Sequence, residues 1–181
     1  FVSIGSGPMT DTHALEAMRL ISGNLIEMIA NPSDIALREK IMLGSMQAGL
    51  AFSNAILGAV HAMSHSLGGY LDLPHGQCNA TLIEHVVAFN FDAAPERFTI
   101  IAQTFGLDCR GLTPPQVRQR LIDYLITFKQ AVGFKDSLAT YGVSSSDIPF
   151  LSQHAMGDPC ILTNPRSSNQ RDMQVVYGEA L

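Results

Sequence analysis

Apolar residues in the first part of the chain recur every three or four positions, which is the spacing of one face of an α-helix. They predict a first helix over residues 9–30, which Asn31-Pro32 would end. A second helix is expected to begin at Pro32-Ser33-Asp34 and to run to about residue 56. Small residues between Gly44 and Ser53 lie at helical spacing, so this helix can approach a neighbouring backbone closely.

The stretch from Ile41 to Leu71 contains no Asp, Glu, Lys or Arg, so a membrane span is the first alternative to weigh. Its serine, asparagine, glutamine and histidine side chains would be costly to place in lipid. We therefore expect two helices that are buried in a protein interior and joined near Leu57-Gly58. The second of them is predicted to end at Gly68-Gly69, because glycine suits the position after a helix.

The remaining apolar pattern predicts further helices, over residues 75–90, 95–106, 114–132 and 146–155 and from residue 170 onward. No stretch of any length alternates apolar and polar residues, as a half-buried strand would. The predicted fold class is therefore all-α, a bundle of seven or eight helices. Nothing indicates the parallel sheet that a complete dinucleotide-binding fold requires.

The composition adds limits on partners and location. The 181 residues are 46% apolar and only 15% charged, which suggests that much surface is buried against the chain's own layers or a partner. A net charge of −5 argues against nucleic acid or an anionic membrane as the main partner. Three widely spaced cysteines, Cys78, Cys109 and Cys160, favour buried thiols in a reducing compartment, so a cytoplasmic protein is expected.

The candidate chemistry lies in the histidines. His61 and His65 are four positions apart and so share one face of a helix. His75 follows a Gly-Gly pair and comes directly after Pro74, in a turn long enough to bring it back against the same face. Neutral imidazole is a common ligand of divalent transition metals, and these three histidines are therefore candidates for one metal site.

Spacing alone leaves this metal site open. A buried histidine is more often a hydrogen-bonded core residue than a ligand, and a catalytic metal needs at least three protein ligands. Asp72 and Glu84 are nearby carboxylates that could complete the set, and neither has diagnostic spacing. The sequence contains no HExxH motif, which argues against a zinc protease.

Several stretches of the chain resemble the iron-containing alcohol dehydrogenases. They are Ala48–Asn54, Gly58–Gly69, Pro74–Gly76, Asn79-Ala80, Glu84–Val86, Asp158–Cys160 and Leu162–Arg166. The similarity runs through essentially the whole chain in order, and the histidine segment is its most specific part.

The resemblance implies an all-α domain, the C-terminal helical domain of the dehydroquinate synthase-like, iron alcohol dehydrogenase fold. In that family an N-terminal α/β domain binds a nicotinamide cofactor. The catalytic metal, held by one Asp and three His, lies in the cleft between the two domains. His61 and His75 match two of the metal-binding histidines, and His65 matches a histidine beside the metal that is implicated in catalysis.

The family's other two ligands come from an Asp-x3-His helix, which this chain does not show. The residue four before His13 is Met9, and the stretch around them resembles the family's next helix. We therefore expect residues 1–181 to be a single all-helical metal-binding domain. The expected fragment lacks the N-terminal dinucleotide-binding domain and the Asp-x3-His helix. The start, Phe1-Val2-Ser3, looks internal and is not a signal peptide.

For the intact protein, the resemblance implies reversible oxidation of a small alcohol to an aldehyde or ketone with NAD or NADP. Fe²⁺ is the expected metal with Zn²⁺ as an alternative, a homo-oligomer is the expected assembly, and no residue is assigned to cofactor binding. The fragment itself is expected to be inactive. The competing interpretation is a non-enzymatic helical interaction or metal-binding module, and a lyase of the dehydroquinate synthase type is a third.

Overall fold

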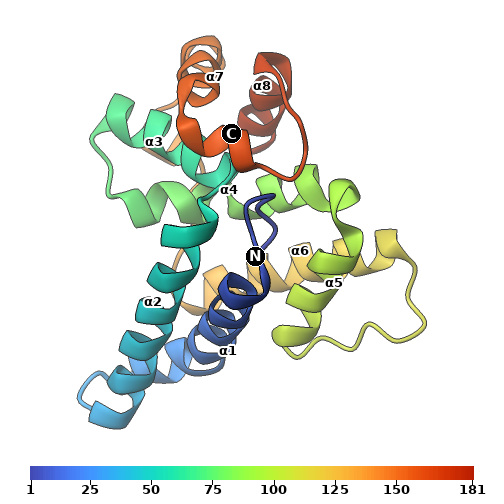
Figure 1. Cartoon of the computed structure of the whole chain (residues 1–181). Coiled ribbons are helices and arrows are strands. Elements are labelled where there is room, and N and C mark those ends of the chain that lie inside the picture. Colours follow the sequence, from blue (N-terminus) through green and yellow to red (C-terminus); the bar gives the residue numbers. More distant parts are fainter. The chain divides into compact units, whose positions relative to one another are not determined.

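The structure is a computed structural model that describes all residues from 1 to 181, and it contains helices and no strands (Figure 1). The prediction of an all-α fold is confirmed. The eight α-helices are α1 (Pro8–Ala30), α2 (Ile35–Ala55), α3 (Ala59–Leu71), α4 (His75–Asn90), α5 (Pro95–Thr104), α6 (Pro114–Ala131), α7 (Ile148–Gly157) and α8 (Gln170–Glu179). Three short 3₁₀ helices cover Phe91–Ala93, Ala139–Tyr141 and Pro159–Thr163.

The helices form two compact units, and each unit is built from two separate stretches of sequence. The first unit comprises residues 1–56 and 94–133, and therefore contains α1, α2, α5 and α6. The second unit comprises residues 57–93 and 134–181, and contains α3, α4, α7 and α8. All three candidate histidines belong to the second unit.

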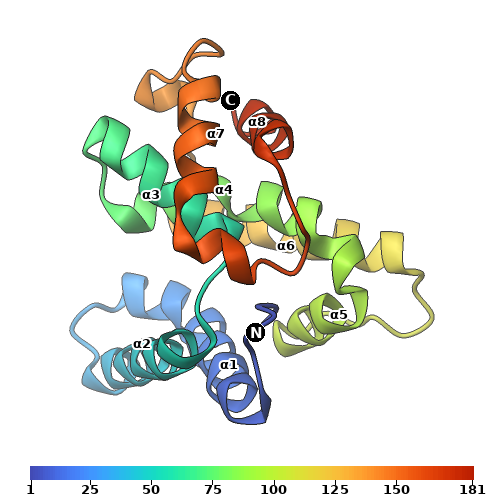
Figure 2. The same cartoon turned by 45° about the horizontal axis from the view of Figure 1, so that its top comes forward.

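In the first unit, α1 and α2 lie side by side as a helical hairpin (Figure 2). Asp34 caps α2, where its carboxylate accepts the backbone N–H groups of Ala36 and Leu37. Gly44 allows the close contact of the two helices, because a Cβ at this position would lie 2.8 Å from the side chain of Ile21. The prediction from the small residues therefore holds at Gly44.

The prediction that both helices of the charge-free stretch are buried is wrong for α2. Only the face that packs on α1 is buried, and Met42 and Met46 on the other face are 70% and 55% exposed. The absence of charged residues therefore does not mean that this helix is buried within the 181-residue chain. No single helix is long and apolar enough to cross a membrane, and α2 and α3 pass that test only when counted together across their break.

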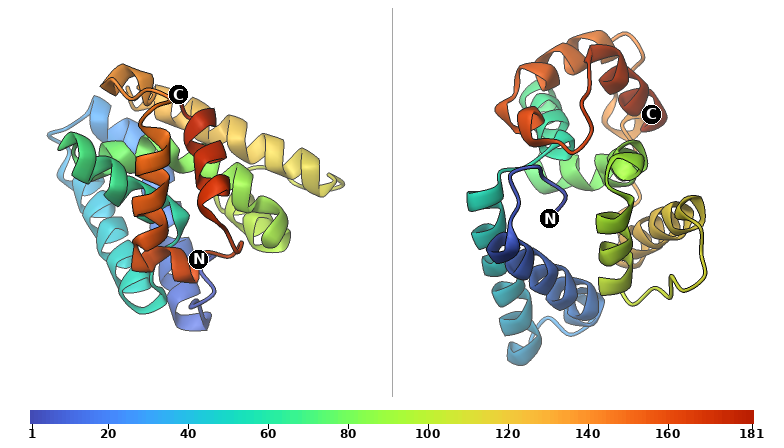
Figure 3. Two further views of the ribbon diagram at one scale, coloured as in Figure 1. Left: turned by 90° about the horizontal axis from the view of Figure 1, so that it is seen from above. Right: turned by 45° about the vertical axis from the view of Figure 1, so that its right-hand side comes forward.

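In the second unit, α3 packs against α4 and α7, and α7 and α8 lie side by side (Figure 3). The core is apolar and tightly closed, with fully buried Met63, Leu67, Leu82, Leu151, Met173 and Tyr177. The Tyr177 hydroxyl donates to the backbone carbonyl of Met63 at 2.7 Å, so the one polar atom of this ring is satisfied. This core holds α3 and α4, which carry the histidines.

The predicted end of α3 at Gly68-Gly69 is wrong, because the helix continues to Leu71. It stops at Asp72, which adopts the left-handed conformation with φ 54°. Gly68 lies within this helix, where a Cβ would make ordinary contacts, 3.5 Å from the Leu73 carbonyl oxygen and 3.6 Å from the Cys78 sulfur. Because α3 ends at Leu71, only residues 72–74 form the turn, and α4 begins at His75 as predicted.

Candidate metal centre

Three imidazole rings come together where α3 meets the start of α4. His61 and His65 lie one turn apart on α3, with ring centroids 6.0 Å apart. The ring centroid of His75 lies 5.1 Å from that of His61 and 5.1 Å from that of His65. The tight turn after α3 therefore returns His75 to the face that carries the other two histidines.

The Nε2 atoms of His61 and His75 face the same side chain, that of Asn79. The amide nitrogen of Asn79 lies 3.0 Å from Nε2 of His75 and 3.5 Å from Nε2 of His61. The amide oxygen of Asn79 is buried and has no hydrogen-bond partner. Both ring nitrogens thus lie within hydrogen-bond distance of the same amide nitrogen, beside a buried polar atom that is not satisfied.

The electrostatic surroundings keep His61 neutral. Burial, followed by the nearby His75 and His65, lowers the pKa of the His61 imidazole to about 4, although Asp158 acts in the opposite direction. Neutral imidazole is the form that binds a metal, so a ring with this pKa remains available as a ligand well below pH 7. His61 and His75 therefore fit a divalent ion such as Fe²⁺ or Zn²⁺ in donor type, and their Nε2 atoms face the same amide group.

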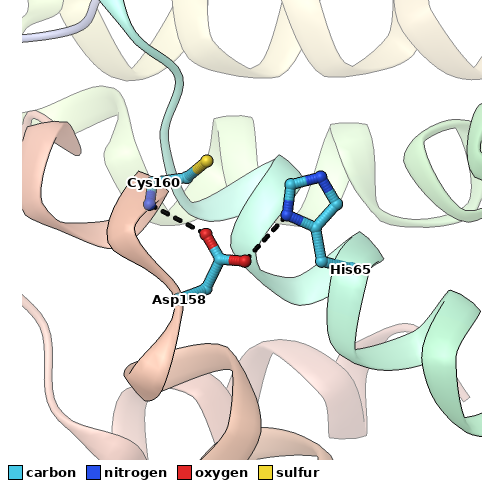
Figure 4. Close-up of side chains that lie close together, drawn as sticks. All are labelled: His65, Asp158 and Cys160. Carbon is cyan, nitrogen blue, oxygen red and sulfur yellow. Dashed lines mark hydrogen bonds and ion pairs between the residues drawn. The ribbon is translucent and has the colours of Figure 1, made fainter.

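His65 has a different environment from the other two. Its ring is 43% exposed, and its Nδ1 lies 2.8 Å from a carboxylate oxygen of Asp158 (Figure 4). The other oxygen of Asp158 accepts the backbone N–H of Cys160 at 2.8 Å. Although burial raises the pKa of Asp158, the hydrogen bonds from Cys160 and His65 outweigh it, so the carboxyl pKa lies below its usual value.

Asp158 was not predicted as a site residue. The sequence singled out Asp158-Pro159-Cys160 only as part of the resemblance, and spacing cannot connect it to a histidine 93 residues earlier. Together with His65, Asp158 and Cys160 form a group whose donor atoms lie within 4.8 Å of one another. The carboxylates weighed at the sequence level lie elsewhere: Asp72 caps α3, and Glu84 lies 3.7 Å from its neighbour His85.

A buried network connects the segment after Asp158 to the first turn of α3. Asn164 accepts the backbone N–H of Ala59 at 3.0 Å and exchanges two hydrogen bonds of 2.8 Å with Asn90. The hydroxyl of Thr163 donates to the carbonyl of Leu57 at 2.7 Å. The 3₁₀ helix Pro159–Thr163 is therefore fixed to the helix that carries His61 and His65.

Comparison with known proteins shows the family to which the chain belongs. The sequence model of the C-terminal part of the Fe-containing alcohol dehydrogenase family matches residues 1–181. The chain belongs to this family. It is 36% identical over 180 residues to 1,3-propanediol dehydrogenase of Klebsiella pneumoniae, a match that covers 99% of this chain and 46% of that protein. It is 38% identical over 181 residues to NAD-dependent methanol dehydrogenase of Bacillus methanolicus, of which it covers 48%.

Solved structures of the iron-containing alcohol dehydrogenases also share this fold. A crystal structure of 1,3-propanediol oxidoreductase superposes with a TM-score of 0.96 at 36% identity, over 99% of this chain and 47% of that one. The predicted correspondence to the helical C-terminal domain is therefore confirmed. The chain spans about half the length of the curated relatives that it matches.

Proposed function

We propose that this chain supplies the metal-holding, helical half of an NAD(P)-dependent alcohol dehydrogenase. The observation that carries the proposal is that the Nε2 atoms of His61 and His75 both lie within 3.5 Å of the Asn79 amide nitrogen, with the ring of His65 5.1 Å from that of His75. In this proposal His61 and His75 are two of the metal's ligands, and His65 acts on the substrate. Membership of the family supports these roles.

The metal, when bound, supplies Lewis acidity toward a substrate oxygen. His61 contributes a ligand that stays neutral at physiological pH, because its pKa is lowered to about 4. His75 contributes the second ligand from the first turn of α4, where the preceding turn fixes its backbone. His65 exchanges the proton of the substrate hydroxyl at Nε2, because its Nδ1 is already engaged by Asp158.

The same proposal includes the substrate, the hydride carrier, the metal and the assembly of the intact protein, and the names of its relatives support the choice of substrate. The printed names of the relatives include 1,3-propanediol dehydrogenase, NAD-dependent methanol dehydrogenase and lactaldehyde reductase, which suggests a small alcohol or aldehyde as substrate. We propose NAD or NADP as the hydride carrier and Fe²⁺ as the metal, with Zn²⁺ as the alternative. A cytoplasmic homo-oligomer is the proposed form, and the three free, buried cysteines are compatible with a reducing compartment.

The domain proposal is that residues 1–181 act as one metal-binding domain and depend on a nucleotide-binding part outside them. Two imidazoles leave a catalytic metal short of the three protein ligands that it requires. The relatives are about twice as long as this chain, which leaves room for a nucleotide-binding part and for the missing ligands. The 181-residue chain alone is therefore expected to lack dehydrogenase activity.

The test is an alcohol oxidation assay of the 181-residue chain and of an intact polypeptide that ends in this chain, each with Fe²⁺ and NAD or NADP. The intact polypeptide should reduce the nicotinamide, and His61→Ala and His75→Ala should each abolish both the reaction and the bound metal. His13→Ala is the matched control, since this histidine lies on α1 of the first unit and its Nδ1 is engaged by the side chain of Gln47. Activity that survives the loss of both ligands would overturn the proposal, as would activity of the 181-residue chain by itself.

A further inference from the structure

We propose that Asp158 is a positioning residue, which fixes the tautomer and the orientation of His65. This inference rests on the proposed role of His65 in proton exchange. It adds a second component to the site, because His65 then works as a carboxylate–imidazole pair. The pair joins α3 to the segment that follows α7.

The first support is that both oxygens of the Asp158 carboxylate are engaged by different donors. One oxygen lies 2.8 Å from Nδ1 of His65, and the other accepts the backbone N–H of Cys160 at 2.8 Å (Figure 4). The carboxylate therefore cannot turn away from the imidazole without losing the bond to the backbone. Its orientation is set by the main chain and does not depend on His65.

The second support is that the backbone on both sides of this pair is fixed. Asp158 immediately precedes the 3₁₀ helix Pro159–Thr163, whose far end is tied to the start of α3 by Thr163 and Asn164. His65 lies further along the same α3. Asp158 and His65 thus lie on two elements, the 3₁₀ helix segment and α3, that other hydrogen bonds already hold together. The fold therefore determines the distance between the two side chains.

The chemical consequence concerns the proton on the ring. An ionised carboxylate only accepts hydrogen bonds, so Nδ1 of His65 must carry the hydrogen, and the lone pair of the neutral ring must lie on Nε2. During oxidation of an alcohol, the hydroxyl proton would pass to Nε2 of His65, and the nicotinamide, when bound, would supply the hydride acceptor. The resulting imidazolium is stabilised by the negative charge of Asp158, and reduction returns the proton from Nε2.

The same three side chains could instead be interpreted as a second cation site, since His65, Asp158 and Cys160 offer donor atoms within 4.8 Å. The hydrogen bonds favour the positioning role, because both Asp158 oxygens already have donors. The thiol also keeps its proton at neutral pH, since burial, followed by the Asp158 carboxylate, raises the pKa of Cys160 to about 11. We therefore infer a proton-directing pair here.

The substitution Asp158→Asn gives an unusually sharp test. An asparagine has one acceptor oxygen, and if that oxygen keeps the bond to the N–H of Cys160, the amide NH₂ faces Nδ1 of His65. The NH₂ group donates, so the ring must then place its hydrogen on Nε2. Asp158→Asn should therefore invert the tautomer of His65, whereas Asp158→Ala should leave a mixture of both tautomers.

Nuclear magnetic resonance of the ¹⁵N-histidine-labelled, metal-free 181-residue chain reports the tautomer directly from the two ring nitrogen shifts. In the wild type, His65 should show a protonated Nδ1 and an unprotonated Nε2. Asp147→Asn is the matched control, because Asp147 accepts from Tyr70 and Ser144 and makes no contact with His65. A wild-type His65 with its hydrogen on Nε2, or a tautomer unchanged in both Asp158 variants, would overturn the inference.

Kinetics of the intact polypeptide provide the second measurement. Asp158→Asn should lower kcat by at least ~10-fold, with a much smaller change in KM and an unchanged metal content, since a well-placed general base contributes about 10²–10⁴-fold and the variant would place the hydrogen on the wrong ring nitrogen. Loss of metal together with activity would indicate a structural role and would overturn the positioning role. A wild-type protein that shows the expected tautomer but oxidises no alcohol would contradict only the proposed function.

Discussion

The backbone N–H of Ala59, in the first turn of α3, is bound by the side-chain oxygen of Asn164, which lies 105 residues later in the chain. Asn164 is buried and also exchanges two hydrogen bonds with Asn90. The start of the histidine helix is therefore held by the C-terminal segment. The close fit at Gly58, where a Cβ would lie 3.1 Å from the Asn164 oxygen, shows how tightly this junction packs.

Asn164→Ala should therefore destabilise the second unit strongly. The substitution leaves the N–H of Ala59 and the amide of Asn90 buried without their partner, and we expect a loss of about 2–4 kcal/mol in the free energy of unfolding. Urea unfolding monitored by circular dichroism measures it. Asn54→Ala is the control, because Asn54 is exposed on α2 and bonds only its own helix at Leu50. Equal effects of the two substitutions would contradict this account of the junction.

Two serines on α3 should respond differently to replacement by alanine. Ser64 is fully buried and its hydroxyl has no hydrogen-bond partner, so Ser64→Ala should leave stability unchanged or raise it by up to about 1 kcal/mol. Ser66 donates to the Leu151 carbonyl on α7 at 2.8 Å, so Ser66→Ala should cost about 1 kcal/mol. Thermal unfolding of the two variants measures these changes in stability. A larger loss of stability for Ser64→Ala than for Ser66→Ala would show that the Ser64 hydroxyl has a partner.

Two glycines of α2 provide a similar pair. Gly44→Ala should destabilise the α1–α2 hairpin by about 1–3 kcal/mol, because the added methyl group would lie 2.8 Å from Ile21 and 3.2 Å from Leu20. Gly49→Ala meets nothing within 4 Å and should stabilise the helix by up to about 1 kcal/mol, since alanine is the better helix former. Denaturant midpoints measure the change in stability for both substitutions. A change of the same sign at Gly44 and Gly49 would rule out close packing at Gly44.

The stability of the metal-free chain should fall as the pH is lowered from 6.5 to about 4, because the pKa of His61 is lowered by burial and by the neighbouring histidines. Across this range the unfolded chain binds the proton and the folded chain does not, which favours unfolding. Below pH 4 both states are protonated and the effect levels off. Because His61 is partly exposed, solvent screening limits the loss to about 1–2 kcal/mol.

The pH effect of His61 is isolated by comparing the wild type with His61→Gln in urea unfolding at several pH values. His75, His65 and Asp158 are the titratable groups that act on His61, and they are present in both proteins. The difference in the free energy of unfolding should therefore change between pH 6.5 and 4 and stay constant above that range. A difference that does not depend on pH would contradict the lowered pKa.

Much of this structure could be predicted from local sequence, because helix ends and apolar faces are local properties. The start at His75, the stop near Asn31 and the all-α class follow from proline, polar and apolar positions within one or two turns. The end of α3 was mispredicted because Gly68 and Gly69 remain helical, and the left-handed residue that ends the helix is Asp72. The exposure of Met42 and Met46 depends on which face of α2 meets α1, and composition does not report that.

The candidate site also contains residues that local sequence predicts and residues that only tertiary packing brings together. His61, His65 and His75 lie within fifteen positions, so helical periodicity and one turn were enough to predict that they meet. Asp158 is 93 residues from His65, and only the packing of α3 on α7 and the segment after it brings the two together. Asn79 entered the sequence analysis only as part of the resemblance, and its place between the ring nitrogens of His61 and His75 became visible only in the structure.

The most direct test of the central claim is a Zn²⁺ titration of the ¹⁵N-histidine-labelled 181-residue chain, with Zn²⁺ as a diamagnetic substitute for Fe²⁺. The account predicts that the Nε2 resonances of His61 and His75 shift together and weakly, as two ligands of an incomplete site, while Nδ1 of His65 keeps its hydrogen. It also predicts that His61→Ala abolishes the shift at His75. A shift centred on Nδ1 of His65 instead, or none at His61 and His75, would contradict the assignment of the two ligands.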